Sequence, residues 1–143
     1  MPEGVQNRMR AWDPLLAVQT FAAGARLFSL QLPASGVAAC PAGVIDLAPR
    51  LVDFSETAAA LRNLDLLISA ETAVAHLAGA LGVPVWLPMP PTVDWRWEVE
   101  SRQSPWYASV RLFPPAEPMH FQSAFAAMAQ AFAAREYLQA QIR

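Results

Sequence analysis

The turn between Ser69 and Thr72 has the residue types and the setting that best suit ligand chemistry. It follows the continuous apolar segment 65–69 and precedes the stretch 72–81, in which apolar residues recur at helical spacing. The first N–H groups of a helix lack partners within the helix and, with the helix dipole, they attract anions. We therefore expect the three amides after Thr72 to face an anionic ligand. These amides belong to Ala73, Val74 and Ala75.

His76 follows Thr72 by one helical turn, so both residues lie on one face of the predicted helix. A histidine there can donate to a phosphate oxygen or to a sugar hydroxyl, and Thr72 can cap the helix or donate its hydroxyl to a phosphate. Two plainer interpretations stay open, in which Thr72 is only a cap and His76 is a structural residue. The chain has neither a P-loop nor a GxGxxG pattern. No carboxylate pair has ligand spacing around the two histidines, so we expect no metal site.

Strands and helices alternate around this turn, a pattern typical of a parallel sheet between layers of helices. The predicted strands are residues 26–31, 44–47, 65–69, 83–87 and 110–113, and the predicted helices begin at Pro14, Ser55, Thr72 and about Pro118. The fold class is therefore α/β, with a Rossmann-like parallel sheet flanked by helices. In such sheets ligands bind beyond the carboxyl ends of the strands, which is where Ser69 and Thr72 lie.

The ends and faces of the helices are also predicted. Asp13 and Ser55 are expected to cap the first two helices, and Gly82 to end the third. In the first helix Leu15, Val18 and Ala22 fall at helical spacing. The last helix has an apolar face that its own core or a partner must cover, its own core being the commoner case. This face consists of Phe121, Phe125, Met128 and Phe132.

Residues 88–108 form a loop rich in proline and aromatic residues. Trp95, Trp97 and Trp106, together with Tyr107, could form a lid over a bound base, because aromatic rings stack well on bases. The same rings could instead pin the loop onto the sheet. Pinning is favoured, because a loop of this length in a compact domain needs internal packing.

The composition favours one soluble domain. The 143 residues suit a single α/β domain at 12–143 after a flexible leader at 1–11, and 55% hydrophobic residues can form a core. The ten basic residues are scattered and the net charge is -2, which argues against a nucleic-acid partner. The single cysteine excludes a disulfide within the chain. No apolar stretch reaches about 20 residues, so we expect no membrane span and a cytoplasmic location.

Four motifs occur in order along the chain. They are DLLISAETAVAHLAGALGVPVWL (65–87), DWRW (94–97), SPWY (104–107) and VRLF (110–113). In this succession the chain resembles the C-terminal part of glycosyltransferase family nine, over about residues 12–135. The similarity is greatest to bacterial members in which tetratricopeptide repeats precede this domain. The heptosyltransferases of lipopolysaccharide core synthesis are more distant relatives.

The resemblance implies the C-terminal half of a GT-B fold, in which two Rossmann-like domains face each other across a cleft. In this family the C-terminal domain binds the nucleotide-sugar donor through an Asp-Thr pair, followed by a histidine four places after the threonine. Glu71 stands here in place of that aspartate. Gln31, in the SLQ motif, is implied to approach the nucleotide. The implied residues for the donor diphosphate and sugar are Glu71, Thr72, Ala73, Val74 and His76.

The implied reaction is an inverting, metal-independent glycosyl transfer that uses no cofactor, and the catalytic residues stay unassigned. We expect the chain to hold only the donor half. The first strand of the domain and the acceptor domain, with its general base, are expected to be missing. The expected partners are a nucleoside diphosphate or nucleotide-sugar, a second copy of the chain, or an acceptor-domain chain. The alternative is a non-catalytic remnant or interaction module, with a degenerate site, that self-associates or pairs through an incomplete sheet edge.

Overall fold

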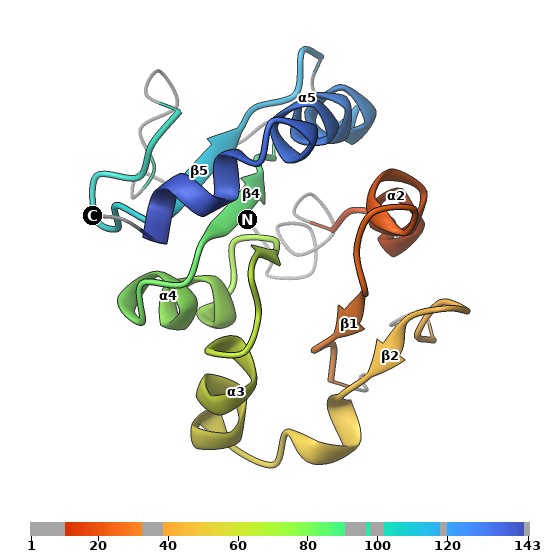
Figure 1. Ribbon diagram of the computed structural model, residues 1–143, viewed down its shortest axis with the longest axis vertical. Coiled ribbons are helices and arrows are strands. Elements are labelled where there is room, and N and C mark those ends of the chain that lie inside the picture. Colours follow the sequence, from red (N-terminus) through yellow and green to blue (C-terminus); the bar gives the residue numbers. More distant parts are fainter. Residues whose placement is uncertain (1–10, 33–38, 91–96, 98–101, 118–119, 142–143) are drawn as a thin grey trace, which may run out of the picture.

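The computed structural model describes residues 11–32, 39–90, 97, 102–117 and 120–141, and it contains two parallel sheets (Figure 1). The larger sheet has the strand order β3-β4-β5 and the smaller has β1-β2. The five predicted strands all form. The first four are shorter than predicted, and the last has the predicted bounds. Their bounds are β1 Phe28–Ser29, β2 Ile45–Asp46, β3 Leu67–Ile68, β4 Val85–Pro88 and β5 Val110–Phe113. The mixed α/β class with parallel strands is therefore confirmed, whereas the single sheet is not.

The helices follow the predicted order. They are α2 Pro14–Phe21, α3 Phe54–Leu61, α4 Ala73–Ala80 and α5 Phe121–Ala133, with short 3-10 helices at η1 Ala48–Arg50 and η2 Glu136–Gln141. Asp13 caps α2 as predicted, since its side chain accepts from the N–H of Leu15 at 2.9 Å. The predicted cap of α3 is wrong. Asp53 is the cap, and its carboxylate accepts from the N–H of Glu56 at 2.9 Å, while Ser55 lies inside the helix.

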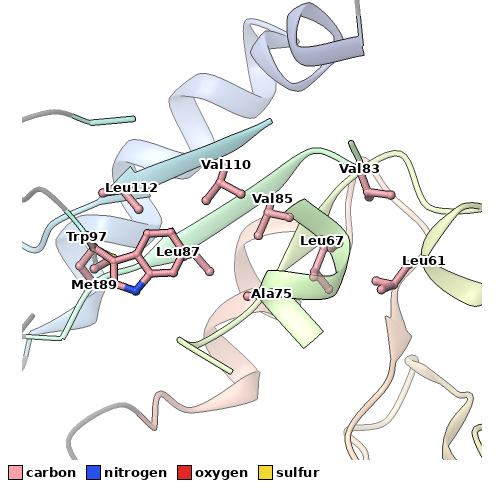
Figure 2. Packing of buried hydrophobic residues seen from close by; sticks show 11 residues of the cluster. Leu61, Leu67, Ala75, Val83, Val85, Leu87, Met89, Trp97, Val110 and Leu112 are labelled. Carbon is pink, nitrogen blue, oxygen red and sulfur yellow. The ribbon is translucent and has the colours of Figure 1, made fainter. Parts of the chain in front are cut away.

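The larger sheet lies between two helical layers, because successive strand residues point to opposite faces. Val85 and Leu87 of β4 join one apolar cluster with residues of α4, whereas Trp86 joins a second cluster with α5 and α2. Figure 1 shows α4 and α5 on opposite sides of β4 and β5. Figure 2 shows the first cluster, where Val110 and Leu112 of β5 complete the same face. Burial on both faces explains why these strands read as continuous apolar runs.

The second cluster covers the apolar face of the last helix with the chain's own core. Phe121, Phe125 and Met128 of α5 are buried as predicted. α2 packs against this face through Phe21, whose ring lies 6.4 Å from that of Phe125 between centroids. The buried residue of α2 is Phe21, whereas Leu15, which falls at helical spacing with Val18 and Ala22, is 49% exposed.

The segment before β5 doubles back along that strand. The N–H of Leu112 donates to the carbonyl of Arg102 at 2.9 Å, and the N–H of Ser104 donates to the carbonyl of Val110 at 3.2 Å. These bonds form an antiparallel edge around the bridge between Gln103 and Arg111. The turn that joins the two segments carries Tyr107 over α4, which matters for the site below.

α4 itself ends where the sequence predicts. Gly82 has a φ of +73°, a conformation that glycine adopts without steric cost. The N–H of Val83 then donates to the carbonyl of Ala78 at 3.0 Å, which closes the helix end. The turn is immediately followed by β4. The β3–α4–β4 unit thus fixes the orientation of α4 against the sheet.

Candidate functional site

The turn from β3 to α4 lies at the carboxyl end of a parallel strand, as the sequence predicts. The N–H of Ser69 still bonds to β4, through the carbonyl of Trp86 at 3.3 Å. Thr72 is the N-cap residue of α4, with an extended backbone at φ -132° and ψ 169°. The first turn of α4 therefore begins three residues after the last sheet bond of β3.

The Thr72 hydroxyl bonds to Ser69 rather than to the helix. Thr72 occupies the N-cap position of α4, but among the described residues no side chain accepts from the first N–H groups of the helix. The two hydroxyl oxygens of Ser69 and Thr72 lie 3.2 Å apart, and Ser69 Oγ donates to the carbonyl of Ala70 at 2.9 Å. Since Ser69 has one hydroxyl hydrogen, Thr72 is the donor in the pair. Thr72 itself is exposed.

Two of the three predicted anion-binding amides keep their N–H groups available. The N–H of Ala75 donates to the carbonyl of Thr72 at 3.0 Å, so the prediction fails for this residue. Within the described residues no acceptor takes the N–H of Ala73 or Val74. Ala73 is exposed and Val74 is half-buried. These two donors lie at the positive end of the helix dipole, an arrangement that in general favours anions.

His76 lies between two aromatic rings that come from the loop region. Trp97 stacks on it with ring centroids 5.3 Å apart and planes at 23°. Tyr107 approaches edge-on, and its hydroxyl lies 3.3 Å from His76 Nδ1. His76 is half-buried, and among the described residues nothing bonds to its Nε2. The histidine is thus held in place by packing, with one ring nitrogen left for a ligand.

Tyr107 and Gly79 belong to this site. Tyr107 is one of the predicted lid or pinning residues, whereas sequence reasoning missed Gly79. A Cβ at position 79 would lie 2.7 Å from Tyr107 Cγ, so the ring fits only because residue 79 is glycine. Gly79 follows His76 by three residues and therefore shares its helix face. A glycine inside a short helix was the available signal, since within a helix it costs about 0.5–1 kcal/mol relative to alanine and calls for a packing reason.

Glu71 and Thr72 are neighbours in sequence but differ in exposure. The Glu71 side chain is 7% exposed, whereas Thr72 is on the surface. The resemblance implies that residue 71 contacts the sugar, and this role stays a prediction. Gln31 follows β1 and is exposed, with its N–H donating to Ser29 Oγ at 3.2 Å. In the described part of the chain no hydrogen bond, ion pair or ring contact joins Gln31 to Thr72 or His76.

The three tryptophans of the predicted lid have different positions. Trp97 is 3% exposed, and Figure 2 shows its indole beside Leu87, Met89 and Leu112. In this structure Trp97 is therefore pinned into the core, as the favoured interpretation predicts. Trp106 is 60% exposed, and Trp95 lies outside the described residues.

The described residues contain no group of three or more His, Cys, Asp or Glu placed to hold a metal ion. Within the same ranges, none of the helices combines the length and the apolar character needed to cross a bilayer. No family model, curated protein or solved structure matches this chain. The function is therefore inferred from the site and from the sequence motifs that surround it.

Proposed function

We propose that this chain is the donor-binding half of an inverting, metal-independent glycosyltransferase similar to family nine. In this proposal the first turn of α4 binds the diphosphate of a nucleoside diphosphate sugar. The observation that carries it is the pair of N–H groups of Ala73 and Val74, which have no acceptor in the described structure. They lie at the carboxyl end of a parallel strand, where open α/β sheets bind their ligands.

The chemistry of glycosyl transfer suits such a position. As the bond between the sugar and the diphosphate breaks, negative charge builds up on the leaving diphosphate. Fixed N–H dipoles at a helix N-terminus stabilise that charge without having to reorganise. His76 would add a donor through Nε2, and Thr72 could turn its hydroxyl from Ser69 to a phosphate oxygen. The described chain offers the charge stabilisation, and the acceptor and its base are left to another domain.

The division of the sheet supports a place in the C-terminal half of a GT-B fold. A doubly wound sheet has the strand order 3-2-1-4-5-6. If β1 and β2 are the second and third strands, and β3 to β5 the fourth to sixth, the first strand would lie between β1 and β3. The described strands separate at this point, with β1 paired only to β2 and β3 paired only to β4.

A proline substitution tests the diphosphate site directly. Ala73 is the first residue of α4, where proline is tolerated because its φ is already helical and this N–H makes no helix bond. Thr72 has the extended backbone that a following proline requires. Ala73→Pro therefore removes one donor and keeps the helix. Phe54→Pro is the matched control, since Phe54 is the exposed first residue of α3 and also follows an extended residue.

Calorimetry against ADP, UDP and GDP should show saturable binding of at least one of them to the wild-type chain. Ala73→Pro should weaken that binding by about tenfold, because a hydrogen bond to a charged group contributes about 1.5–3 kcal/mol. Phe54→Pro should bind like the wild type. Absence of binding at millimolar nucleotide, or equal binding by all three proteins, would rule the proposal out.

A second candidate, the interaction module, is favoured by one observation. Among the described strands β3 is an edge of the larger sheet and β1 is paired on one side. Unpaired strand edges invite pairing with another chain. If the chain acts as such a module, sedimentation should show a concentration-dependent dimer that nucleotides leave unchanged. A strictly monomeric species that binds nucleotide would decide in favour of the donor site.

A further inference from the structure

We infer that Tyr107 is a positioning residue for His76, whose hydroxyl keeps the imidazole proton on Nε2. In this arrangement Tyr107 donates its O–H to His76 Nδ1, and Nε2–H becomes a donor even when the ring is neutral. The inference rests on the proposed function for its ligand, because a phosphate oxygen is the acceptor that Nε2–H would meet. Its structural part concerns the protein without ligand and can be tested alone.

The direction of the hydrogen bond follows from the available groups. Tyr107 Oη lies 3.3 Å from His76 Nδ1, and within the described residues it has no other hydrogen-bond partner. A neutral imidazole has one donor nitrogen and one acceptor nitrogen. If Nδ1 accepts, the phenol hydrogen has a partner and Nε2 holds the proton. If Nδ1 were the donor, the described protein would offer no acceptor for the phenol hydrogen. Nε2 would then carry no proton, so it could not donate a hydrogen bond to a phosphate oxygen.

The position of the hydroxyl is set by the backbone rather than by the bond itself. The Tyr107 ring lies against Gly79, where a side chain would collide with it. Ser104 Oγ accepts from the N–H of Tyr107 at 3.2 Å, and the carbonyl of Tyr107 accepts from the N–H of Val110 at 3.1 Å. The bond of 3.3 Å is longer than the usual O–H contact of about 2.8 Å, which fits a contact that packing imposes.

Trp97 restrains the other side of the ring. It stacks on His76 at 5.3 Å and is itself buried in the core, so the imidazole has aromatic neighbours on two sides. A ring held in this way keeps Nδ1 at Tyr107. The orientation of a ligating histidine is commonly fixed through the hydrogen bond that its other nitrogen makes. Here a phenol would serve in place of the usual carbonyl or carboxylate.

The test is a ¹⁵N spectrum of the imidazole nitrogens, recorded on the alkaline plateau where their shifts no longer change with pH. The chain has two histidines, and His120→Gln assigns the signals of His76. In the wild type, His76 Nδ1 should have the chemical shift of a nitrogen that carries no proton. The chemical shift of Nδ1 in the exposed His120 should be less close to that value. Tyr107→Phe keeps the ring and removes the hydroxyl, and it should move the His76 shifts toward those of His120.

Nucleotide binding then separates this inference from the proposed function. Tyr107→Phe should weaken binding of the nucleoside diphosphate by about fivefold, the effect of one neutral hydrogen bond. A protonated Nδ1, or shifts that Tyr107→Phe leaves unchanged, would overturn the inference even if nucleotide binds. The expected shifts in a protein that binds no nucleotide would instead retain the positioning role and reject the proposed ligand.

Discussion

The ring of Tyr107 lies so close to Gly79 that a Cβ at position 79 would be 2.7 Å from Cγ and 2.9 Å from Cδ2 of that ring. These atoms belong to the base of the side chain, which cannot swing away as its far end could. The contact places the Tyr107 hydroxyl beside His76. A glycine in the last turn of α4 thus has a specific structural role.

Replacing Gly79 by alanine tests this contact, because the contact decides whether the free energy of unfolding falls or rises. Helix propensity alone favours alanine over glycine by about 1 kcal/mol. Overpacking costs about 1–3 kcal/mol, so we expect Gly79→Ala to lower the free energy of unfolding by up to about 2 kcal/mol. Urea denaturation measures it.

The control is the same substitution in a Tyr107→Ala background, which lacks the ring. There Gly79→Ala should raise the free energy of unfolding, because the propensity gain is no longer offset. The two residues then show an interaction energy in a double-mutant cycle. Equal effects of Gly79→Ala in both backgrounds would contradict the contact.

The cap of α3 provides a second prediction. Asp53→Ala should lower the free energy of unfolding by about 1 kcal/mol, since the N–H of Glu56 loses its acceptor. Ser55→Ala should be neutral or slightly stabilising, because Ser55 is exposed inside the helix and alanine is the better helix former. If Ser55→Ala were the more costly substitution, Ser55 rather than Asp53 would be the cap of α3.

The packing of α2 on α5 provides a third prediction. Phe21 is 2% exposed and contacts the rings of Phe125 and Phe132. Phe21→Ala should therefore lower the free energy of unfolding by about 3–5 kcal/mol. Leu15→Ala, on the exposed side of the same helix, should change it by less than about 0.5 kcal/mol. If Phe21→Ala leaves too little folded protein to measure, Phe21→Leu should still cost more than Leu15→Ala.

Much of the fold could be predicted from local sequence patterns. Asp13 before Pro14 is a strong helix start, and Gly82 after an apolar run is a strong helix stop, so both were located correctly. The sequence is ambiguous where two local solutions compete. Asp53 and Ser55 can both cap a helix, and the choice depends on where the preceding 3-10 turn ends. Leu15 and Phe21 are both apolar, and only the position of α5 decides which one is buried.

The candidate site was predictable in part for a similar reason. The amides of Ala73 and Val74 follow from the helix start alone, since every helix leaves its first N–H groups unpaired. The environment of His76 does not follow from the helix start. Trp97 and Tyr107 are 21 and 31 residues away in sequence, and they reach the helix only through tertiary packing. Ala75 was wrong because the first turn tightened and its N–H took the carbonyl of Thr72.

The central claim is that the first turn of α4 binds a diphosphate, and an amide titration tests it most directly. ¹H–¹⁵N spectra recorded while ADP, UDP or GDP is added should show the largest saturable shifts at the N–H groups of Ala73 and Val74. The N–H of Glu56, which already donates to Asp53, should not move. Saturable shifts at Ala73 and Val74 would establish the site, whereas no shifts, or shifts gathered elsewhere on the chain, would contradict it.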